Sequence, residues 1–254
     1  MNSKVFGYIA LMLLLAFGQV QAQDSTNFRP HFEHRIDAGF NFGATTPVGI
    51  PATIRSIDAF WPEFCPALGY ELSYMLHPKW GVSLGVKLDY KGMGTKDHVQ
   101  YFPTIITVQD GSSTGTFEGI FTGQNKTTIK NTYFTVPFGA VFHPNINWRF
   151  TLGGYVAWKF SSNFYGDVSN GYIRNGGPTG EKILVDHATF DFSNEVRNFD
   201  AGLNGSVERR VGKRLSVMGD LSWGLRPIFS SDFKGLDFPL YNIYLMLGVS
   251  YRIM

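Results

Sequence analysis

The sequence predicts an all-β protein, a transmembrane antiparallel up-and-down β-barrel of eight strands. Three observations support this prediction. Segments of about ten residues alternate between apolar and polar side chains, as membrane strands do. The connections between these segments are short and long in turn. The chain ends on such a segment, and a closed barrel needs one there because its last strand pairs with its first.

The start of the chain predicts a secretory signal peptide. Lys4 precedes a short apolar run over 5–17, and a small-x-small cleavage pattern ends at Ala22. The run is shorter than the roughly 20 apolar residues of a membrane-spanning helix. The predicted organisation is a signal peptide (1–22), an N-terminal periplasmic segment (23–33) and a barrel domain (34–254).

Composition excludes several classes of protein. Aromatic residues make up 16% of the chain and charged residues only 17%, which suits strands with a lipid-facing surface. Loss of Lys4 with the signal peptide lowers the formal charge from +2 to +1, and this near-neutral balance argues against nucleic-acid binding. Cys65 is the only cysteine, so neither an internal disulfide nor a thiolate metal cluster can form. We expect no cofactor and no metal.

The first three strand segments each have one apolar and one polar face. The first covers about 34–43 and the second about 67–76; in both, the even-numbered residues from Ile36 and Leu68 onward are apolar. The third, about 80–91, alternates most cleanly. Its even-numbered residues are apolar, and the residues between them are Gly, Ser, Lys or Asp. Such alternation predicts strands that face lipid on one side.

The other five segments repeat the pattern. They cover about 131–142, 148–160, 197–208, 214–226 and 241–254. Pro137 lies within the fourth segment and removes one backbone donor, so we expect a bulge or weak pairing there. The last segment sets an apolar face against a mixed face that carries Arg252. Eight segments therefore fit one barrel.

The connections sort by length. A few residues join the second segment to the third, the fourth to the fifth and the sixth to the seventh, whereas about 23, 39, 36 and 14 residues make the other four connections. Short periplasmic turns and long extracellular loops are typical of outer-membrane barrels. Apolar residues over 99–108 and 114–121 predict that the third and fourth strands extend as a hairpin beyond the membrane. The alternative is an extra membrane hairpin, which would give ten strands. The 161–196 connection predicts a mobile surface loop.

Eleven charged residues face inward by parity. An eight-stranded barrel is just wide enough to be filled by its own side chains, and buried charges must be paired. The near balance of acids and bases therefore predicts a structural network in the lumen. Its members are Asp37, Glu71, Lys87, Asp89, Arg149, Lys159, Asp200, Glu208, Asp220, Arg226 and Arg252.

The sequence leaves two other functions open. A gated or ligand-responsive passage through the lumen would make the protein a small solute channel. A lipid-modifying enzyme would need a serine and a histidine near the membrane face. Ser73, Ser83 and Ser222 point inward by parity and no histidine lies outward at mid-strand, so we expect no catalytic residues. Aromatic residues near the predicted strand ends, Trp80, Tyr90, Trp148 and Trp158, are placed to form belts at the two membrane surfaces.

Several strand motifs resemble the PorT-like family of outer-membrane β-barrels. They lie at 35–42, 68–74, 80–92, 133–139, 199–205 and 247–252. Met254 departs from the pattern, since outer-membrane barrels typically end in an aromatic residue. The resemblance implies the outer membrane of a Gram-negative bacterium and, in some members, a link to type IX protein secretion.

We therefore expect a non-enzymatic outer-membrane barrel with a filled lumen and long loops for partner binding or envelope support. Its expected partners are outer-membrane lipid and a protein at the extracellular loops, with no nucleic acid, and the expected state is a monomer. A soluble secreted β-protein is the rival fold, because the alternation of each strand by itself is a weak signal.

Overall fold

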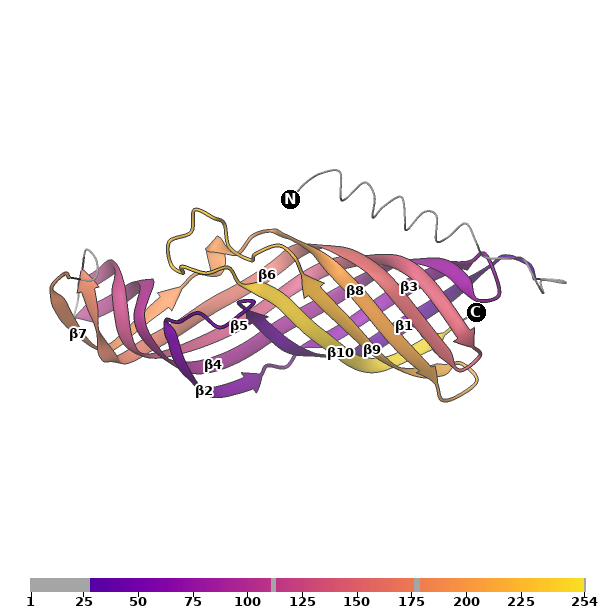
Figure 1. The fold of residues 1–254 in the computed structure, drawn as a ribbon, viewed down its shortest axis with the longest axis horizontal. Helices are drawn as coiled ribbons and strands as arrows, with labels where there is room; N and C mark the ends of the chain where they lie inside the picture. The colour runs from indigo at the N-terminus through magenta and orange to yellow at the C-terminus, as the bar shows by residue number, and fades with distance from the viewer. Residues whose placement is uncertain (1–27, 111–112, 176–178, 254) are drawn as a thin grey trace.

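The computed structural model describes residues 28–110, 113–175 and 179–253 (Figure 1). Among these residues it has ten β-strands and one short 3-10 helix, η2, over Ser193–Glu195. The strands are β1 (His31–Thr46), β2 (Ile54–Pro62), β3 (Pro66–Met75), β4 (Trp80–Asp110), β5 (Ser113–Asn145), β6 (Trp148–Asn175), β7 (Lys182–Asp191), β8 (Phe199–Arg210), β9 (Leu215–Gly224) and β10 (Tyr241–Arg252). The predicted signal peptide and Met254 lie outside the described residues. In the part of the chain that is described, no helix has the length and apolar character to cross a membrane.

Eight of the described strands close into an antiparallel ring, in the order β1-β3-β4-β5-β6-β8-β9-β10 (Figure 1). β1 and β10 close it through an uninterrupted register from Arg35↔Arg252 to Thr46↔Tyr241. The predicted pairing of first and last strands is confirmed. Gly39 and Gly248 face each other on this seam, and a Cβ on Gly248 would lie 2.2 Å from the Ala38 carbonyl oxygen. The backbones of β1 and β10 therefore lie too close together at this point for either residue to carry a side chain.

Three strands continue well past the ring. β4, β5 and β6 have 31, 33 and 28 residues, and their distal halves form an extension with β2 and β7 (Figure 1). β2 pairs with β4 over 93–99, and β7 pairs with distal β6. The predicted hairpin of the third and fourth strands is confirmed. Neither β2 nor β7 adds a strand to the ring.

The prediction of a mobile surface loop over 161–196 was wrong. β6 runs on to Asn175 and pairs with β7 from Tyr165↔Asp191 to Arg174↔Lys182. Phe164, Val168 and Val185 point into a buried apolar core, which a mobile surface loop would not form. Asn170 and Gly171, whose types indicated a loop, instead lie within this ladder, where Gly171 pairs with Val185 and Asn170 has a φ of 51°.

The ring is apolar outside and polar inside. On β4, buried and exposed residues alternate without exception from Gly81 to Tyr90, with Leu84 57% exposed and Lys87 7% exposed. Opposite Pro137, the β4–β5 ladder lacks the pairs at Gly85 and Val86 while its register is unchanged on both sides. This is the weak pairing expected where a proline lacks its N–H.

Three tight turns lie at the end of the ring that also carries the end of β10 (Figure 1). The β5–β6 turn is closed by the Asn145 side chain, whose Oδ1 accepts hydrogen bonds from the backbone N–H groups of Asn147 at 2.9 Å and Trp148 at 3.1 Å. Asparagine suits such positions because its side chain can replace a backbone acceptor. The predicted sorting of short turns and long connections to opposite ends is thus confirmed.

Candidate functional site

Charged side chains from strands that are not neighbours in the ring meet near the short-turn end of the lumen. We call Glu33, Arg35, Glu71, Arg149 and Glu208 the base cluster. Arg35 donates hydrogen bonds of 2.9 Å to both Glu33 and Glu208. Arg149 bridges Glu208 and Glu71. The cluster therefore links β1, β3, β6 and β8 across the lumen.

Midway along the lumen lies a second group, the middle cluster of Lys87, Asp89, Asp220, Asn204 and Asn41. The Lys87 ammonium lies 3.8 Å from a carboxylate oxygen of both Asp89 and Asp220. Asn204 donates to Asp220 at 2.5 Å, and Asn41 donates to Asp89 at 2.7 Å. Each buried carboxylate in this cluster thus has both a cation and a neutral donor, as burial of charge requires.

Above the middle cluster, three tyrosines enclose one lysine. The Lys91 Nζ atom lies 5.5 Å, 4.9 Å and 5.9 Å from the ring centroids of Tyr133, Tyr155 and Tyr244. All four side chains are 1% exposed, and Nζ is 3.6 Å from Asp89. A desolvated cation over aromatic faces is favourable by roughly 2 kcal/mol. We call these four residues the tyrosine layer, and they fill the lumen where the extension begins.

The eleven residues expected inside the lumen do not all have the same surroundings. Glu71, Lys87, Asp89, Arg149, Glu208 and Asp220 make the ion pairs just described. Asp200 accepts hydrogen bonds from Tyr155 at 3.0 Å and Asn242 at 2.9 Å, and Arg252 lies at the rim, 30% exposed and 3.8 Å from Glu33. Asp37 lines a cavity of about 20 Å³, which has room for a water.

Lys159 and Arg226 lie apart from these clusters. The Lys159 Nζ donates to the Val196 carbonyl at 2.5 Å, beside a register shift in the β5–β6 ladder. β9 ends at Gly224, so the strand alternation no longer fixes the direction of Arg226. Its guanidinium lies 5.4 Å from the Phe199 ring centroid. Lys159 pairs with the lumen residue Tyr133 and so keeps its inward parity, whereas parity does not place Arg226, which lies beyond the end of β9.

Sequence reasoning missed several lumen residues. Glu33 and Lys91 continue the inward parity of Asp37 and Asp89 but lie just beyond or at the edge of the predicted strands. Tyr133 and Tyr155 also have inward parity, but the predicted network contains only charged residues. Among the described residues, no three His, Cys, Asp or Glu side chains are grouped to hold a metal ion.

The extension has an apolar core of its own, with a pocket at its base. A β-bulge in the β4–β5 pairing falls between Val99 and Phe102, where Tyr101 has a φ of 55°. Tyr101 is half-exposed, so Val99 and Phe102 both turn inward despite their opposite parity. The upper pocket is the resulting cavity of about 100 Å³, lined mainly by Met93, Asp97, Val99, Phe102, Ile129, Phe164 and Phe190.

Asp97, a buried carboxylate of the extension, provides a pH-dependent prediction. Desolvation raises the pKa of Asp97, and the nearby Asp58 carboxylate adds to this, while hydrogen bonds from Thr95 and Asn125 act in the opposite direction. The folded extension therefore binds the proton more tightly than the unfolded chain does. The extension is expected to lose stability as pH rises through the pKa values of the unfolded and then the folded state, and to regain it at acid pH.

Asp97→Asn should remove this dependence. We expect the variant to protect β4 and β5 amides from hydrogen exchange better than the natural protein does at pH 7, with the difference vanishing near pH 3.5. The ratio of protection factors, measured by mass spectrometry at each pH, cancels the intrinsic exchange rate. A ratio that stays constant over this range would contradict the prediction.

Cys65 is expected to be unreactive in the folded protein. Its thiol is 3% exposed and donates to the Gly92 carbonyl at 3.5 Å, and burial raises its pKa to about 11. Only the thiolate reacts, so labelling at pH 7.5 should be about 100-fold slower than that of an unperturbed cysteine. A maleimide gel-shift assay should show rapid modification only after denaturation. Rapid labelling of folded protein would show that the 63–65 segment opens.

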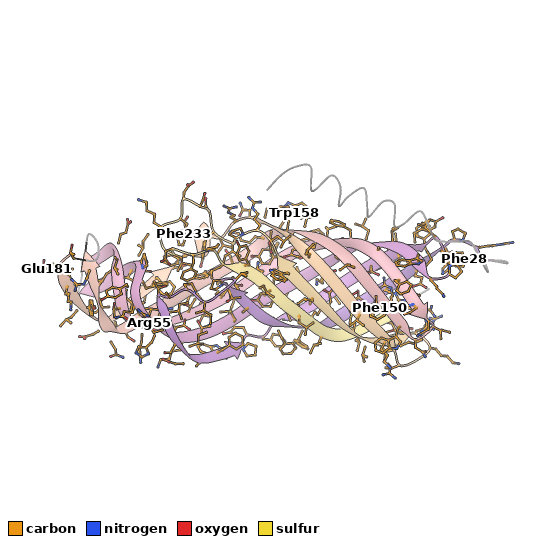
Figure 2. All side chains as sticks on the ribbon, viewed as in Figure 1. Phe28, Arg55, Phe150, Trp158, Glu181 and Phe233 are labelled. Carbon is orange, nitrogen blue, oxygen red and sulfur yellow. The ribbon has the colours of Figure 1, made fainter. Side chains whose placement is uncertain are left out.

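Aromatic side chains mark both ends of the apolar band. Trp80 packs on Phe142 at the short-turn end with ring centroids 4.4 Å apart, and Trp158 packs on Phe199 at the other end. Figure 2 shows the same separation for the labelled Phe150 and Trp158. Trp80 and Tyr90 are ten residues apart on β4, a height of about 25 Å for a tilted strand, which matches the band of a membrane barrel.

Three solved structures of Ail, the attachment invasion locus protein of Yersinia pestis, are similar to this chain. The structure in complex with the heparin analogue sucrose octasulfate is 9% identical, with a TM-score of 0.34 over 89% of this chain and 100% of that one. A second crystal structure is 11% identical, with a TM-score of 0.33 over 87% and 97%. The structure in a phospholipid bilayer nanodisc is 13% identical, with a TM-score of 0.32 over 88% and 100%. No curated protein matches the chain.

A closed ring that is apolar outside and charged inside defines an integral β-barrel membrane protein. The sequence model of the family described as "Outer membrane protein beta-barrel domain" matches residues 21–230. The chain belongs to this family. It is embedded in the lipid of the bacterial outer membrane.

Proposed function

We propose that this protein is a non-enzymatic barrel whose lumen is closed by its own side chains and whose extension carries a binding surface outside the cell. The observation that carries the proposal is the bridging of strands across the lumen by Arg149, with the tyrosine layer above it. Water and ions would have to displace paired charges that are almost fully buried. Such displacement is costly, which favours a structural lumen over a passage.

Single-channel recording in planar lipid bilayers tests the closed lumen. We expect no reproducible conductance steps from the natural protein. A variant with Glu71, Lys91 and Arg149 changed to alanine should conduct, which shows that the assay detects an open lumen. Both proteins must first show the mobility shift on heating that marks a folded barrel. Clear steps from the natural protein would contradict the proposal and favour a small solute channel.

The absence of enzymatic activity is part of the proposal. The Ser73 hydroxyl donates to Glu71 and accepts from Arg149, and the Ser222 hydroxyl donates to the Tyr244 carbonyl. None of these three hydrogen bonds involves a histidine base. We expect the lipid mass spectra of cells with and without the protein to be the same. A new or missing acyl species would support the lipid-modifying alternative.

The extension is the proposed site of contact with a protein partner. Lys126 is exposed on the distal half of β5, and Lys213 is exposed in the β8–β9 turn at the other end of the barrel. A photo-crosslinking residue at Lys126 in intact cells should capture a discrete protein, and the same residue at Lys213 should not capture it. Equal products at both positions would contradict a specific extracellular partner.

The PorT-like assignment is also a proposal. It is supported by the strand motifs at 80–92 and 133–139, which lie on β4 and β5. Deleting the gene should reduce the surface display of type IX cargo proteins if the secretion link applies. Normal display in the deletion strain would leave the protein a barrel without that role.

The proposed mature form begins at Gln23 and is a monomer. The support for cleavage at this position is the small-x-small pattern that ends at Ala22, followed by a strand that begins at His31. Intact-mass measurement of protein from outer membranes should give the mass of residues 23–254, and cross-linking in membranes should give no specific dimer. A mass that retains the apolar run would contradict cleavage.

A further inference from the structure

The upper pocket lies between the tyrosine layer and the core of the extension. Its walls come from β1, β2, β4, β5 and β6, from Phe190 and Phe192 at the end of β7, and from a more distant part of the chain that supplies Leu236, Phe238 and Leu240. In Figure 2 the labelled Phe233 and Arg55 lie on opposite sides of the molecule near the base of the extension. The pocket is thus built from several elements and does not belong to a single loop.

The pocket has an apolar body and one polar side. Phe102, Ile129 and Phe164 are buried walls, at 6%, 1% and 3% exposed. Asp97, Asn125 and Thr127 form the polar side, on facing stretches of β4 and β5, and the remaining polar lining consists of threonines, Thr45, Thr46, Thr95 and Thr104. Apolar walls with a few converging polar groups are the usual composition of a small-molecule site.

Asp97 has accepting capacity to spare. Its Oδ2 accepts a hydrogen bond from the Thr95 hydroxyl at 3.0 Å, and the Asn125 amide, which also donates to Thr127 at 3.1 Å, supplies a second one. A carboxylate has about four acceptor positions, so some of them remain for a ligand. Within the described residues, no ion pair includes Asp97, although its side chain is only 7% exposed. A carboxylate in an apolar pocket favours a ligand that brings a hydrogen-bond donor and disfavours one that brings a negative charge.

The pocket reaches the outside at β2. Ile57 lines the pocket and is 53% exposed, and β2 pairs with β4 only. A ligand entering there would pass a single, irregularly paired strand, since the β2–β4 ladder has two register shifts. The volume of about 100 Å³ is on the scale of the roughly 150 Å³ apolar cavity that accepts benzene.

We propose that the upper pocket binds a small apolar molecule, about the size of one aromatic ring, that carries a single amine or alcohol donor. The ring occupies the space among Phe102, Ile129 and Phe164, and the donor group hydrogen-bonds to the Asp97 carboxylate. Filling an apolar cavity offsets the loss of packing that an unfilled one imposes on a core. This site is separate from the lumen clusters and does not depend on whether the lumen conducts.

Fluorine NMR on the full-length mature protein in detergent tests the site. The probes are 4-fluorobenzylamine, 4-fluorobenzyl alcohol and 4-fluorobenzoate, each compared with detergent alone. The amine and the alcohol should bind saturably and compete with each other, and the benzoate should bind at least tenfold more weakly. Asp97→Asn should weaken the amine at least tenfold and change the alcohol by less than threefold.

A filled-pocket variant and its matched control locate the binding. Val99→Trp puts a large side chain into the pocket and should abolish binding of both the amine and the alcohol. Lys96→Trp, on the outer face of the same strand, should leave binding of both probes intact. If Val99→Trp does not fold, Ile129→Phe replaces it as the filling change. Absence of saturable binding, equal binding of the benzoate, or binding that survives both Asp97→Asn and the filling change would overturn the proposal.

Discussion

Replacing Arg149 with leucine is expected to lower the free energy of unfolding by about 3–5 kcal/mol, the usual consequence of removing one partner from a buried ion pair. The Arg149 guanidinium pairs with Glu208 and Glu71 and donates to Ser73 at 2.9 Å. Without the Arg149 guanidinium, the Glu71 and Glu208 carboxylates lie in a region of low dielectric and lack the cation that bridges them. Urea-induced unfolding in lipid vesicles, followed by the mobility shift on heating, measures the change.

Two further variants show whether the loss belongs to the lumen charges. Arg214→Leu makes the same substitution in the exposed β8–β9 turn and should change stability by less than about 0.5 kcal/mol. Adding Glu208→Gln to the Arg149 variant removes one of the stranded charges, so the double change should cost at least about 1 kcal/mol less than the sum of the single changes. An Arg149→Leu protein within about 1 kcal/mol of the natural one would show that the base cluster contributes little.

The ring could be predicted because its information is local. Each membrane strand faces lipid on one side and the lumen on the other, so side-chain parity alone places Leu84 outside and Lys87 inside. Loop lengths then indicate which ends meet the periplasm. The same reasoning does not place Arg226, because the alternation of β9 ends at Gly224.

The extension and its pocket could not be derived in this way. The inward turn of both Val99 and Phe102 depends on the bulge at Tyr101, which no periodic pattern indicates. Phe192, Phe229 and Leu240 join the core of the extension from segments that lie outside the long strands. Packing between such distant segments is a tertiary property, so the sequence indicated a long loop where the structure has a second core.

Introducing arginine at Leu84 is expected to cost about 2–4 kcal/mol in a lipid bilayer, because this residue lies on the lipid-facing side at mid-strand. Tyr90→Arg, on the same face of β4 but at the aromatic rim, should cost only about 0–1 kcal/mol. The comparison holds strand, face and introduced charge constant and changes only depth. Unfolding in phosphatidylcholine vesicles measures both variants.

The two arginine variants also separate the membrane barrel from a soluble β-barrel of the same topology. In water, an exposed Leu84→Arg change would be nearly neutral and would improve solubility, since charged side chains on a solvated face carry little penalty. In the membrane, the penalty arises from moving a charge into hydrocarbon, so it must fall towards the interface. Equal stability of the two variants, or a loss larger at Tyr90 than at Leu84, would show that the apolar face of β4 is not buried in lipid at the depth inferred from Trp80 and Tyr90.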